Sequence, residues 1–150
     1  MREPIMLTID GTPIAKGRPR VYRGHGVTPE RTRQAEQAIR DTFNREYPGF
    51  QPFEGRLAMT CRFWMPRNGR PDLDNLVKLV TDALNGLAYR DDEQIDTVTA
   101  YRHLPDRKVR GCNGRMRWRH TGDPLTHHGE EYTPHTAIRI EEIPTERNQQ

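Results

Sequence analysis

The chain has 150 residues, of which 33% are hydrophobic and 30% charged, and its mean hydropathy is −0.98. This size predicts one domain with a single core, and no apolar run reaches the roughly 18 residues that a membrane-spanning helix needs. Residues 1–4 open no apolar signal segment, and two cysteines are too few for a disulfide framework. We therefore expect a cytoplasmic protein in a reducing environment, with a buried free thiol at Cys61.

The basic residues are dominated by arginine and are unevenly distributed. The formal net charge is only +3, but 21 of the 24 basic residues are arginine, which binds phosphate in a fixed geometry and stacks on bases. Between residues 102 and 119 there are seven basic residues and one acid, and a second basic group lies between residues 16 and 23. An arginine-rich overall composition would produce the same bias, but the clustering favours contact with nucleic acid. The expected DNA contacts are Lys16, Arg18, Arg20, Arg67, Arg70, Arg102, Arg107, Lys108 and Arg110.

The N-terminal third predicts one short strand and one helix. Residues 5–10 are typical of a strand, and the glycines and prolines between residues 16 and 29 predict a loop. Thr28 is expected to cap a helix with Pro29 at its first position, and this helix should run to about Tyr47.

The central part carries the clearest patterns. Residues 56–65 alternate between apolar and polar side chains, which predicts a half-buried strand. A polar connector at 66–71 leads into a helix that begins at Leu73 or Asp74 and ends at Leu84. The expected buried positions are Leu57, Met59, Cys61, Phe63 and Met65 in the strand, and Leu76, Leu79, Val80, Ala83, Leu84 and Leu87 in or after the helix.

The C-terminal part predicts two more strands, at 94–102 and 135–143, with Val98 among the residues expected to be buried. Residues 104–134 are rich in Gly, Pro, His and Arg and are expected to form an insertion or irregular excursion outside the core. The interleaved strands and helices predict a single α+β (α/β-type) domain over residues 1–150, with a mixed sheet of about four strands and two main helices. Residues 144–150 are expected to fray.

Two carboxylates stand where the connector becomes the second helix. A helix N-terminus favours anions, so Asp72 or Asp74 could simply be the N-cap, but this explains only one of them. Asn75, Lys78 and Asp82 follow at helical spacing on the face opposite the leucine stripe. Lys78 and Asp82 could be an ordinary ion pair four residues apart, and the alternative is a functional polar face that begins at the carboxylates.

A second acidic segment, Asp91-Asp92-Glu93, follows this helix and precedes the next strand. Three acids in a row are usually a solvated turn, but a crossover could return Asp91 or Asp92 to the Asp72/Asp74 end. Carboxylates that converge without His or Cys favour a hard cation, Mg²⁺ or Mn²⁺. An acidic cluster inside a basic protein is the pattern of a metal-dependent nuclease, in which acids hold the metal and arginines hold the DNA backbone.

The acidic residues occur in a recognisable order: Asp72-x-Asp74-Asn75-x-x-Lys78, then Asp82-Ala83-Leu84, then Asp91-Asp92-x-Gln94. This order resembles the signature of the RusA family, Holliday junction resolvases carried by phages and prophages. The segment Gly11-x-Pro13-x-x-Lys16-Gly17-Arg18-Pro19-Arg20 also resembles phage-type members. The resemblance runs from about residue 5 to residue 102 and again over the last strand.

The resemblance implies a homodimeric, Mg²⁺-dependent endodeoxyribonuclease of DNA recombination and repair that cuts four-way junctions symmetrically. Mn²⁺ is expected to replace Mg²⁺, and neither a nucleotide cofactor nor a membrane is implied. By position, Asp72, Asp74 and Asp92 would be catalytic metal ligands, with Asp91 less favoured than Asp92. Lys78 would be the catalytic lysine at the scissile phosphate, and Asn75 would have an orienting role. Compact members of the family lack most of the stretch 104–134.

Three other interpretations compete with this one. A non-catalytic DNA-binding protein of phage origin would have the same basic surface, and a nucleotide-sugar transferase would use the Asp-x-Asp pair with Mn²⁺. Cys112, with the histidines of the excursion, could bind zinc, but the spacing matches no closed structural site. Trp118 could stack on a base or sugar, although we expect it to pin the excursion to the domain.

Overall fold

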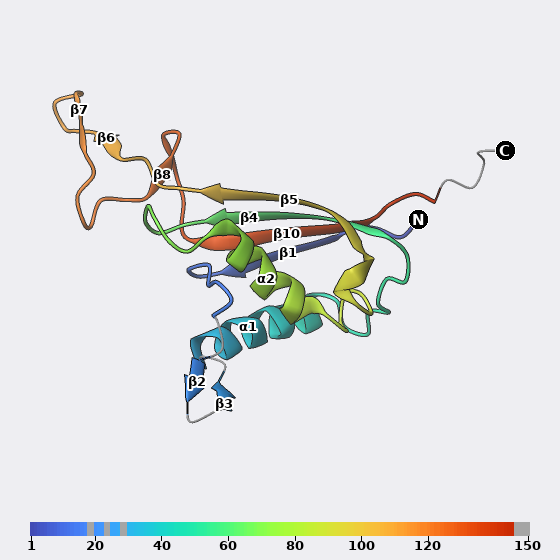
Figure 1. The fold of residues 1–150 in the computed structure, drawn as a ribbon. Helices are drawn as coiled ribbons and strands as arrows, with labels where there is room; N and C mark the ends of the chain where they lie inside the picture. Colours follow the sequence, from blue (N-terminus) through green and yellow to red (C-terminus); the bar gives the residue numbers. More distant parts are fainter. Residues whose placement is uncertain (18–19, 23–24, 28–29, 146–150) are drawn as a thin grey trace.

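The protein is described here by a computed structural model that covers residues 1–17, 20–22, 25–27 and 30–145. Its centre is a four-stranded sheet in the order β1-β10-β4-β5, with both helices on one face (Figure 1). The strands are β1 (Ile5–Asp10), β4 (Leu57–Trp64), β5 (Ile95–His103) and β10 (His135–Glu142), and the helices are α1 (Glu30–Glu46) and α2 (Leu73–Leu84).

The connection between β4 and β5 positions α2. Strand β10 pairs antiparallel with both β1 and β4, whereas β4 and β5 are parallel neighbours. Parallel neighbours need a crossover between them, and α2 is that crossover. The helix therefore begins near the carboxyl ends of β4 and β5 and runs back along the sheet. The predicted α+β class, with four main strands and two helices, is confirmed.

The core fills the space between the sheet and the helices. Every second residue of β4 points into it, as the alternation predicts, and the apolar stripe of α2 covers it. Ile39 and Phe43 close the core from α1, and Tyr89 donates a hydrogen bond from its buried hydroxyl to the carbonyl of Thr81 at 2.7 Å. Cys61 is buried as expected, and this burial raises the pKa of its thiol to about 12.

Two expectations for the periphery are wrong. Val98 is 46% exposed, because β5 is the outermost strand and its side chains extend past the cover that α2 provides. The expected loop 16–29 contains a two-stranded sheet formed by β2 (Arg20–Tyr22) and β3 (His25–Val27). Such short strands leave no periodic signal in a sequence. The expected cap at Thr28 and Pro29, and the end of the tail at 146–150, lie outside the described residues.

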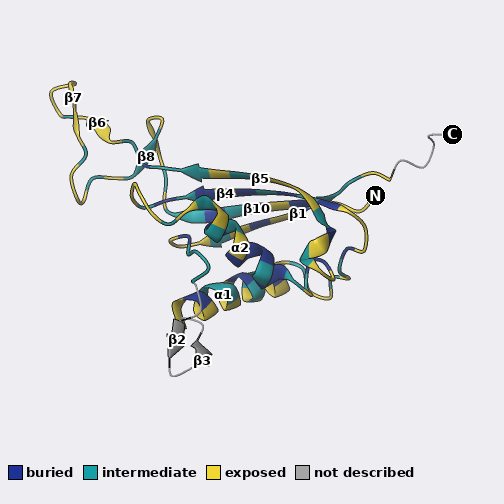
Figure 2. Cartoon of the chain, viewed as in Figure 1, coloured by how far each residue is buried: buried dark blue, intermediate teal, exposed yellow. Residues whose placement is uncertain are grey.

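Residues 104–134 leave the sheet after β5 and form two hairpins, and we call this segment the arm. The first hairpin pairs β6 (Lys108–Arg110) with β7 (Met116–Trp118), and the second pairs β8 (Thr126–His127) with β9 (Glu130–Glu131). The arm projects from the domain and is largely exposed (Figure 2). Trp118 is 62% exposed, so the expectation that it pins this segment to the domain is wrong.

The base of the arm is anchored by an aromatic cluster on the sheet face away from the helices. Trp64 stacks on His103 and His135, its neighbours in register on β5 and β10, with ring centroids 4.2 and 5.4 Å apart. His127 and Tyr132 from the arm pack against the same ring at 5.5 and 5.2 Å. The arm therefore has a fixed attachment to the sheet, although its outer hairpin is solvated.

Neither helix among the described residues has the length and hydropathy that a membrane span requires.

Replacement of residues 107–131 by a short Gly–Ser linker is expected to leave a folded domain with cooperative unfolding. The reason is that the hydrophobic core, among the described residues, contains no member from this stretch. A small fall in melting temperature is expected, because Trp64 loses its contact with His127. Circular dichroism during heating measures both results.

Leu79→Ala in the full chain is the matched reference for true core damage, with an expected loss of about 2–5 kcal/mol of unfolding free energy. A deletion variant without a cooperative transition would show that the arm belongs to the core.

Candidate active site

The start of α2 carries two exposed carboxylates. Asp72 occupies the N-cap position, but its side chain makes no capping hydrogen bond, and Asp74 lies in the first helical turn. A capping carboxylate would accept a hydrogen bond from a backbone N–H of the first turn. Asp72 accepts no such bond, so the N-cap interpretation does not account for its side chain. Both carboxylates remain available to an external ligand.

The polar face of α2 continues into a network of two lysines and two acids. Lys78 Nζ lies 3.1 Å from Asp82 Oδ1, and Lys16 Nζ lies 3.1 Å from the other carboxylate oxygen, Oδ2. Lys16 also pairs with Glu36 of α1 at 2.5 Å. Partial burial works against the ammonium of Lys16, but its hydrogen bonds to Glu36 and Asp82 outweigh that effect and raise its pKa. Asp82 thus holds Lys78 in place while Lys16 balances its charge.

The backbone around Lys16 is fixed between the two helices. The amide N–H of Lys16 donates to the carbonyl of Asn75 at 2.9 Å, which ties this segment to the first turn of α2. The next amide, that of Gly17, donates to Thr32 Oγ1 of α1 at 3.1 Å. Lys16 therefore serves as an ionic bridge between α1 and α2, and its predicted contact with DNA stays a prediction.

Gln94 shapes the turn that carries the second acidic pair. Its side chain is 7% exposed, and its Oε1 accepts hydrogen bonds from the backbone N–H groups of Arg90 and Asp91 at 2.9 and 3.0 Å. Its Nε2 donates to the carbonyls of Phe53 and Gly55 at 2.8 and 3.0 Å. Both polar atoms of this amide are engaged, so Gln94 ties the Asp91–Asp92 turn to the segment 53–55.

Asp92 faces the polar side of α2. A hydrogen bond shared with Asp91, together with partial burial and the negative charges of Asp91 and Asp82, raises the pKa of the Asp92 carboxyl. Lys78 acts on the same carboxyl in the opposite direction. The segment after α2 therefore brings Asp92 near Lys78 and Asp82, and the expected return to the Asp72/Asp74 end stays a prediction.

The carboxylates are the oxygen donors that a hard cation prefers. Asp74 stands about one helical turn before Lys78, Asp72 precedes it as the N-cap residue, and Asp92 lies near Lys78. Among the described residues, no three His, Cys, Asp or Glu side chains are already arranged as a complete metal-binding group. The donor types fit Mg²⁺, and the assignment of Asp72, Asp74 and Asp92 as its ligands stays a prediction.

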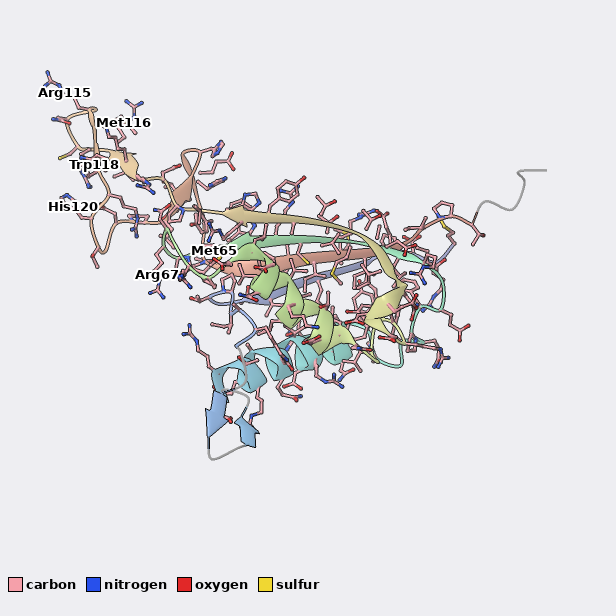
Figure 3. All side chains as sticks on the ribbon, viewed as in Figure 1. Met65, Arg67, Arg115, Met116, Trp118 and His120 are labelled. Carbon is pink, nitrogen blue, oxygen red and sulfur yellow. The ribbon has the colours of Figure 1, made fainter. Side chains whose placement is uncertain are left out.

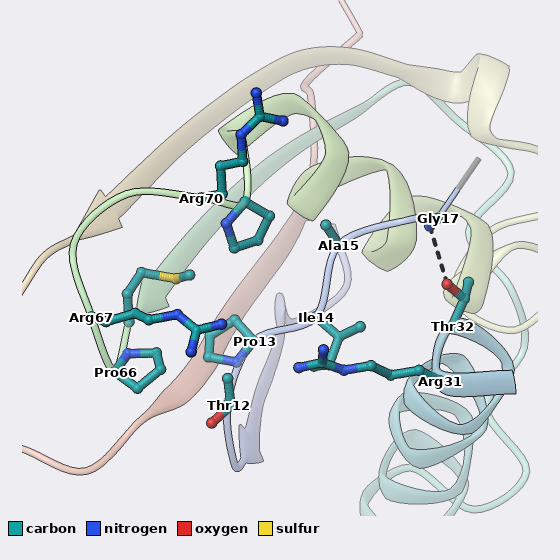
Figure 4. Close-up of a pocket in the computed structure, with 12 residues that line it drawn as sticks. Thr12, Pro13, Ile14, Ala15, Gly17, Arg31, Thr32, Pro66, Arg67 and Arg70 are labelled. Carbon is teal, nitrogen blue, oxygen red and sulfur yellow. Dashed lines mark hydrogen bonds between the residues drawn. The ribbon is translucent and has the colours of Figure 1, made fainter. Parts of the chain in front are cut away.

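A cleft of about 330 Å³ lies beside this helix start, between the 12–17 segment, the beginning of α1 and the connector 65–71. Figure 4 shows Arg31 and Arg67 extending toward one another across it, with Arg70 on the connector. None of these three arginines has an ion-pair partner within the described ranges. Most of the cleft lining is apolar, and the guanidinium groups of Arg31, Arg67 and Arg70 are suited to bind a phosphate at its mouth.

The other residues expected to contact DNA lie in different parts of the structure. Arg102 donates to the carbonyls of Gly69 and Pro71, at 2.9 Å for Pro71, so it holds the connector that leads to Asp72. Arg107, Lys108 and Arg110 are exposed on the arm. Arg18 and the side chain of Arg20 lie outside the described residues.

Comparison with known proteins decides the family. A family model described as Endodeoxyribonuclease RusA matches residues 10–117, which is more than half of the chain. The chain belongs to the RusA endodeoxyribonuclease family. One relative, the Uncharacterized protein YqaN of Bacillus subtilis (strain 168), is 28% identical over 116 residues, which cover 61% of this chain and 81% of YqaN.

Membership in the RusA family makes this chain an endodeoxyribonuclease, a hydrolase that acts on DNA. The family resolves Holliday junctions, which implies a branched DNA substrate, and its nucleases depend on divalent metal ions. The RusA match ends at residue 117, inside β7, so part of the arm falls within the region that the family model covers.

The sequence did not indicate Arg31 or Glu36, and it did not predict the structural contacts of Lys16 and Gln94. The contacts of Lys16 with Glu36 and Asp82 join segments that are far apart in the chain, and no local pattern announces them. Arg31 was missed because an arginine in the first turn of a helix is usually a solvated residue. Gln94 was matched as part of the RusA signature, but its structural role depends on a turn that only the fold creates.

Asp92→Asn is expected to stabilise the protein in EDTA at neutral pH by on the order of 0.5–1 kcal/mol, because it removes a charge held near two other carboxylates. A raised carboxyl pKa means that the folded state binds this proton more tightly than the unfolded chain does. The destabilising charge is therefore present at neutral pH, and the advantage of the variant shrinks as the pH falls through that pKa. Urea unfolding at several pH values measures the effect.

Asp96→Asn is the matched control. Asp96 pairs with Arg56, and this partner lowers the pKa of its carboxyl, so the same change should give no gain in stability. Equal behaviour of the two variants would contradict the repulsion inferred at Asp92.

Proposed function

We propose that this chain resolves four-way DNA junctions by paired, symmetric phosphodiester hydrolysis during recombination and repair. It acts in the cytoplasm as a homodimer with Mg²⁺ as its metal, and Mn²⁺ replaces Mg²⁺. The observation that carries the proposal is the polar face of α2, where Asp74, Lys78 and Asp82 follow one another and Asp92 lies near Lys78 in a member of the RusA family.

Asp72, Asp74 and Asp92 are the residues that would hold the metal ion. When bound, a divalent ion activates a water molecule and neutralises charge on the phosphate. Two observations support metal-binding roles for these residues: the side chain of Asp72 is not used as a helix cap, and the neighbouring acids Asp91 and Asp82 raise the pKa of the Asp92 carboxyl. A cation at this position would relieve that repulsion.

Lys78 is the proposed contact to the scissile phosphate. Its side chain is 56% exposed and holds one carboxylate oxygen of Asp82, while Lys16 holds the other. Because Lys16 balances part of the charge on Asp82, the ammonium of Lys78 can turn to a phosphate oxygen without leaving an uncompensated carboxylate. Lys78 then stabilises the charge that develops on the phosphate as the bond breaks.

The basic surfaces on both sides of α2 supply affinity. The cleft with Arg31, Arg67 and Arg70 lies next to the helix start, and the arm adds Arg107, Lys108 and Arg110. Contacts of this kind bind any DNA backbone, so selectivity for a branch must come from its shape. A homodimer supports two matched cuts, because a four-way junction and an isologous dimer share two-fold symmetry.

Asp74→Asn is expected to lower the rate of junction cleavage on the order of a hundredfold or more, because it removes a metal-binding carboxylate. Junction affinity is expected to stay the same or to increase, since a charge that repels phosphate is lost. Labelled four-way junctions and matched linear duplexes, each incubated with Mg²⁺, Mn²⁺ or EDTA, give the cleavage rates.

Asp41→Asn, at an exposed position of α1, is the control and should cleave like the unmodified protein. Full activity of purified Asp74→Asn would remove Asp74 from the metal site. A protein that binds junctions but does not cut them with either metal would favour the non-catalytic interpretation.

Lys78→Ala is expected to reduce the single-turnover cleavage rate about 10²–10³-fold, the usual cost of one lost donor to a developing negative charge. The junction dissociation constant should change far less, because Lys78 is one of many cations. Lys78→Arg keeps the charge with a different geometry and should recover binding more fully than rate. A defect confined to affinity would make Lys78 an ordinary phosphate contact.

A further inference from the structure

One face of the outer hairpin of the arm combines large apolar side chains with cations. Cross-strand partners share a face, and the register pairs Lys108 with Trp118 and Arg110 with Met116. Met116 is 57% exposed and Trp118 is 62% exposed, and Lys108 Nζ lies 4.9 Å from the centroid of the indole ring. Figure 3 shows Met116 and Trp118 at the far end of the arm, beside Arg115. We call this the hairpin face.

The opposite side of the hairpin holds its shape. Arg117 forms two hydrogen bonds with the carboxylate of Asp123, at 2.8 and 3.0 Å, and that carboxylate also accepts from the N–H of His120. The backbone N–H of Arg119 donates to the carbonyl of Arg107 at 2.8 Å and closes the hairpin base. The guanidinium of Arg119 donates to the carbonyl of Asp123 at 3.1 Å, so Arg117 and Arg119 both have structural contacts. On the hairpin face, Arg110 donates to the carbonyl of Gly114 at 3.0 Å, and its exposed guanidinium, Lys108 and the two apolar side chains are accessible to a ligand.

The base of the arm is bonded to the connector that leads into the active site. His103 accepts a hydrogen bond from the N–H of Met65 at 3.0 Å, and the carbonyl of Pro105 accepts one from Asn68 Nδ2 at 3.4 Å. Tyr132, where the arm returns to the sheet, donates its hydroxyl to the carbonyl of Met65. The base of the arm and the segment before Asp72 are thus joined by hydrogen bonds, which positions the arm relative to α2.

The chemistry of the hairpin face points to nucleic acid. No acidic residue occurs between residues 107 and 122, so the hairpin attracts a polyanion. An indole flanked by cations is suited to the flat face of a base next to phosphates. Inside a closed duplex both faces of a base are covered by its neighbours, so an indole can stack only where the base stack is interrupted.

We propose that the hairpin face binds an unstacked base at the branch point of the DNA, with Trp118 stacked on the base and Lys108 and Arg110 on the neighbouring phosphates. This inference rests on the proposed junction substrate and names the residue that distinguishes a branch from a linear duplex. Trp118 is a specificity determinant outside the acidic site, and its loss leaves the carboxylates and Lys78 unchanged.

The test compares affinities in an Asp74→Asn background, which keeps the DNA intact. Trp118→Ala is expected to bind a four-way junction about tenfold more weakly, the usual loss for one stacked base, and a linear duplex of the same sequence about equally well. Trp118→Phe restores most of the junction affinity, because a phenyl ring also stacks. A 2-aminopurine at the branch point, which brightens when unstacked, should be quenched by the Trp118 protein and not by Trp118→Ala.

Arg107→Ala is the matched control next to the same hairpin, because Arg107 is exposed and does not belong to the hairpin face. It removes a phosphate contact, so it should weaken junction and duplex binding by the same factor and lower the salt slope by about one. Circular dichroism of each variant shows that the arm remains folded, and Trp118→Leu, which keeps an apolar side chain but has no aromatic ring, carries the test if Trp118→Ala does not fold.

If the unmodified protein cuts junctions, two results would overturn this inference and leave the proposed function intact. The first is a junction affinity that is unchanged in Trp118→Ala. The second is an equal loss of affinity for the junction and for the duplex in Trp118→Ala. The first result would assign the hairpin face to a protein partner, and the second would make Trp118 a general DNA contact. A protein that neither binds nor cuts junctions would overturn the proposed function, and the inference with it.

Discussion

The parallel pairing of β4 with β5 constrains every functional element of this protein. Two adjacent parallel strands cannot be joined by a tight turn, so the chain must cross over the sheet, and α2 makes that crossing with its apolar stripe on the core. Its polar face is thereby left toward solvent, with the carboxylates at the carboxyl ends of the strands. The segment that follows α2 then brings Asp92 near Lys78 and Asp82. One topological requirement thus sets the direction of the polar face on which the proposed site lies.

The acidic side chains around Asp92 repel one another. Asp92 lies near other acids, and its carboxyl pKa is raised as a result. Lys16 and Lys78 each pair with one carboxylate oxygen of Asp82, which reduces this repulsion. The hydrogen-bonded amide of Gln94 holds the turn that carries Asp92. Such an arrangement is typical of a place that awaits a cation, because preorganised charge costs folding energy and benefits binding.

The sequence predicted those parts whose periodicity is strong and failed where only tertiary contacts decide. The alternation of β4 and the leucine stripe of α2 fixed both elements closely, because burial on one face forces a regular pattern. Val98 looked like a core residue since alternation does not reveal which strand lies at the edge. The ionic bridge of Lys16 joins segments 20 and 66 residues apart, as its partners are Glu36 and Asp82, and no local rule finds such pairs. Trp118 was expected to pack because large apolar side chains usually do.

The two cysteines differ in a way that has a practical consequence. Cys61 is sealed in the core with a thiol that stays protonated at ordinary pH, whereas Cys112 is exposed in the turn between β6 and β7. A maleimide dye or a spin label applied to the unmodified chain will therefore react at the tip of the arm. The molecule carries its own attachment point for distance measurements, and the path of the arm over bound DNA can be followed by spectroscopy without any change of sequence.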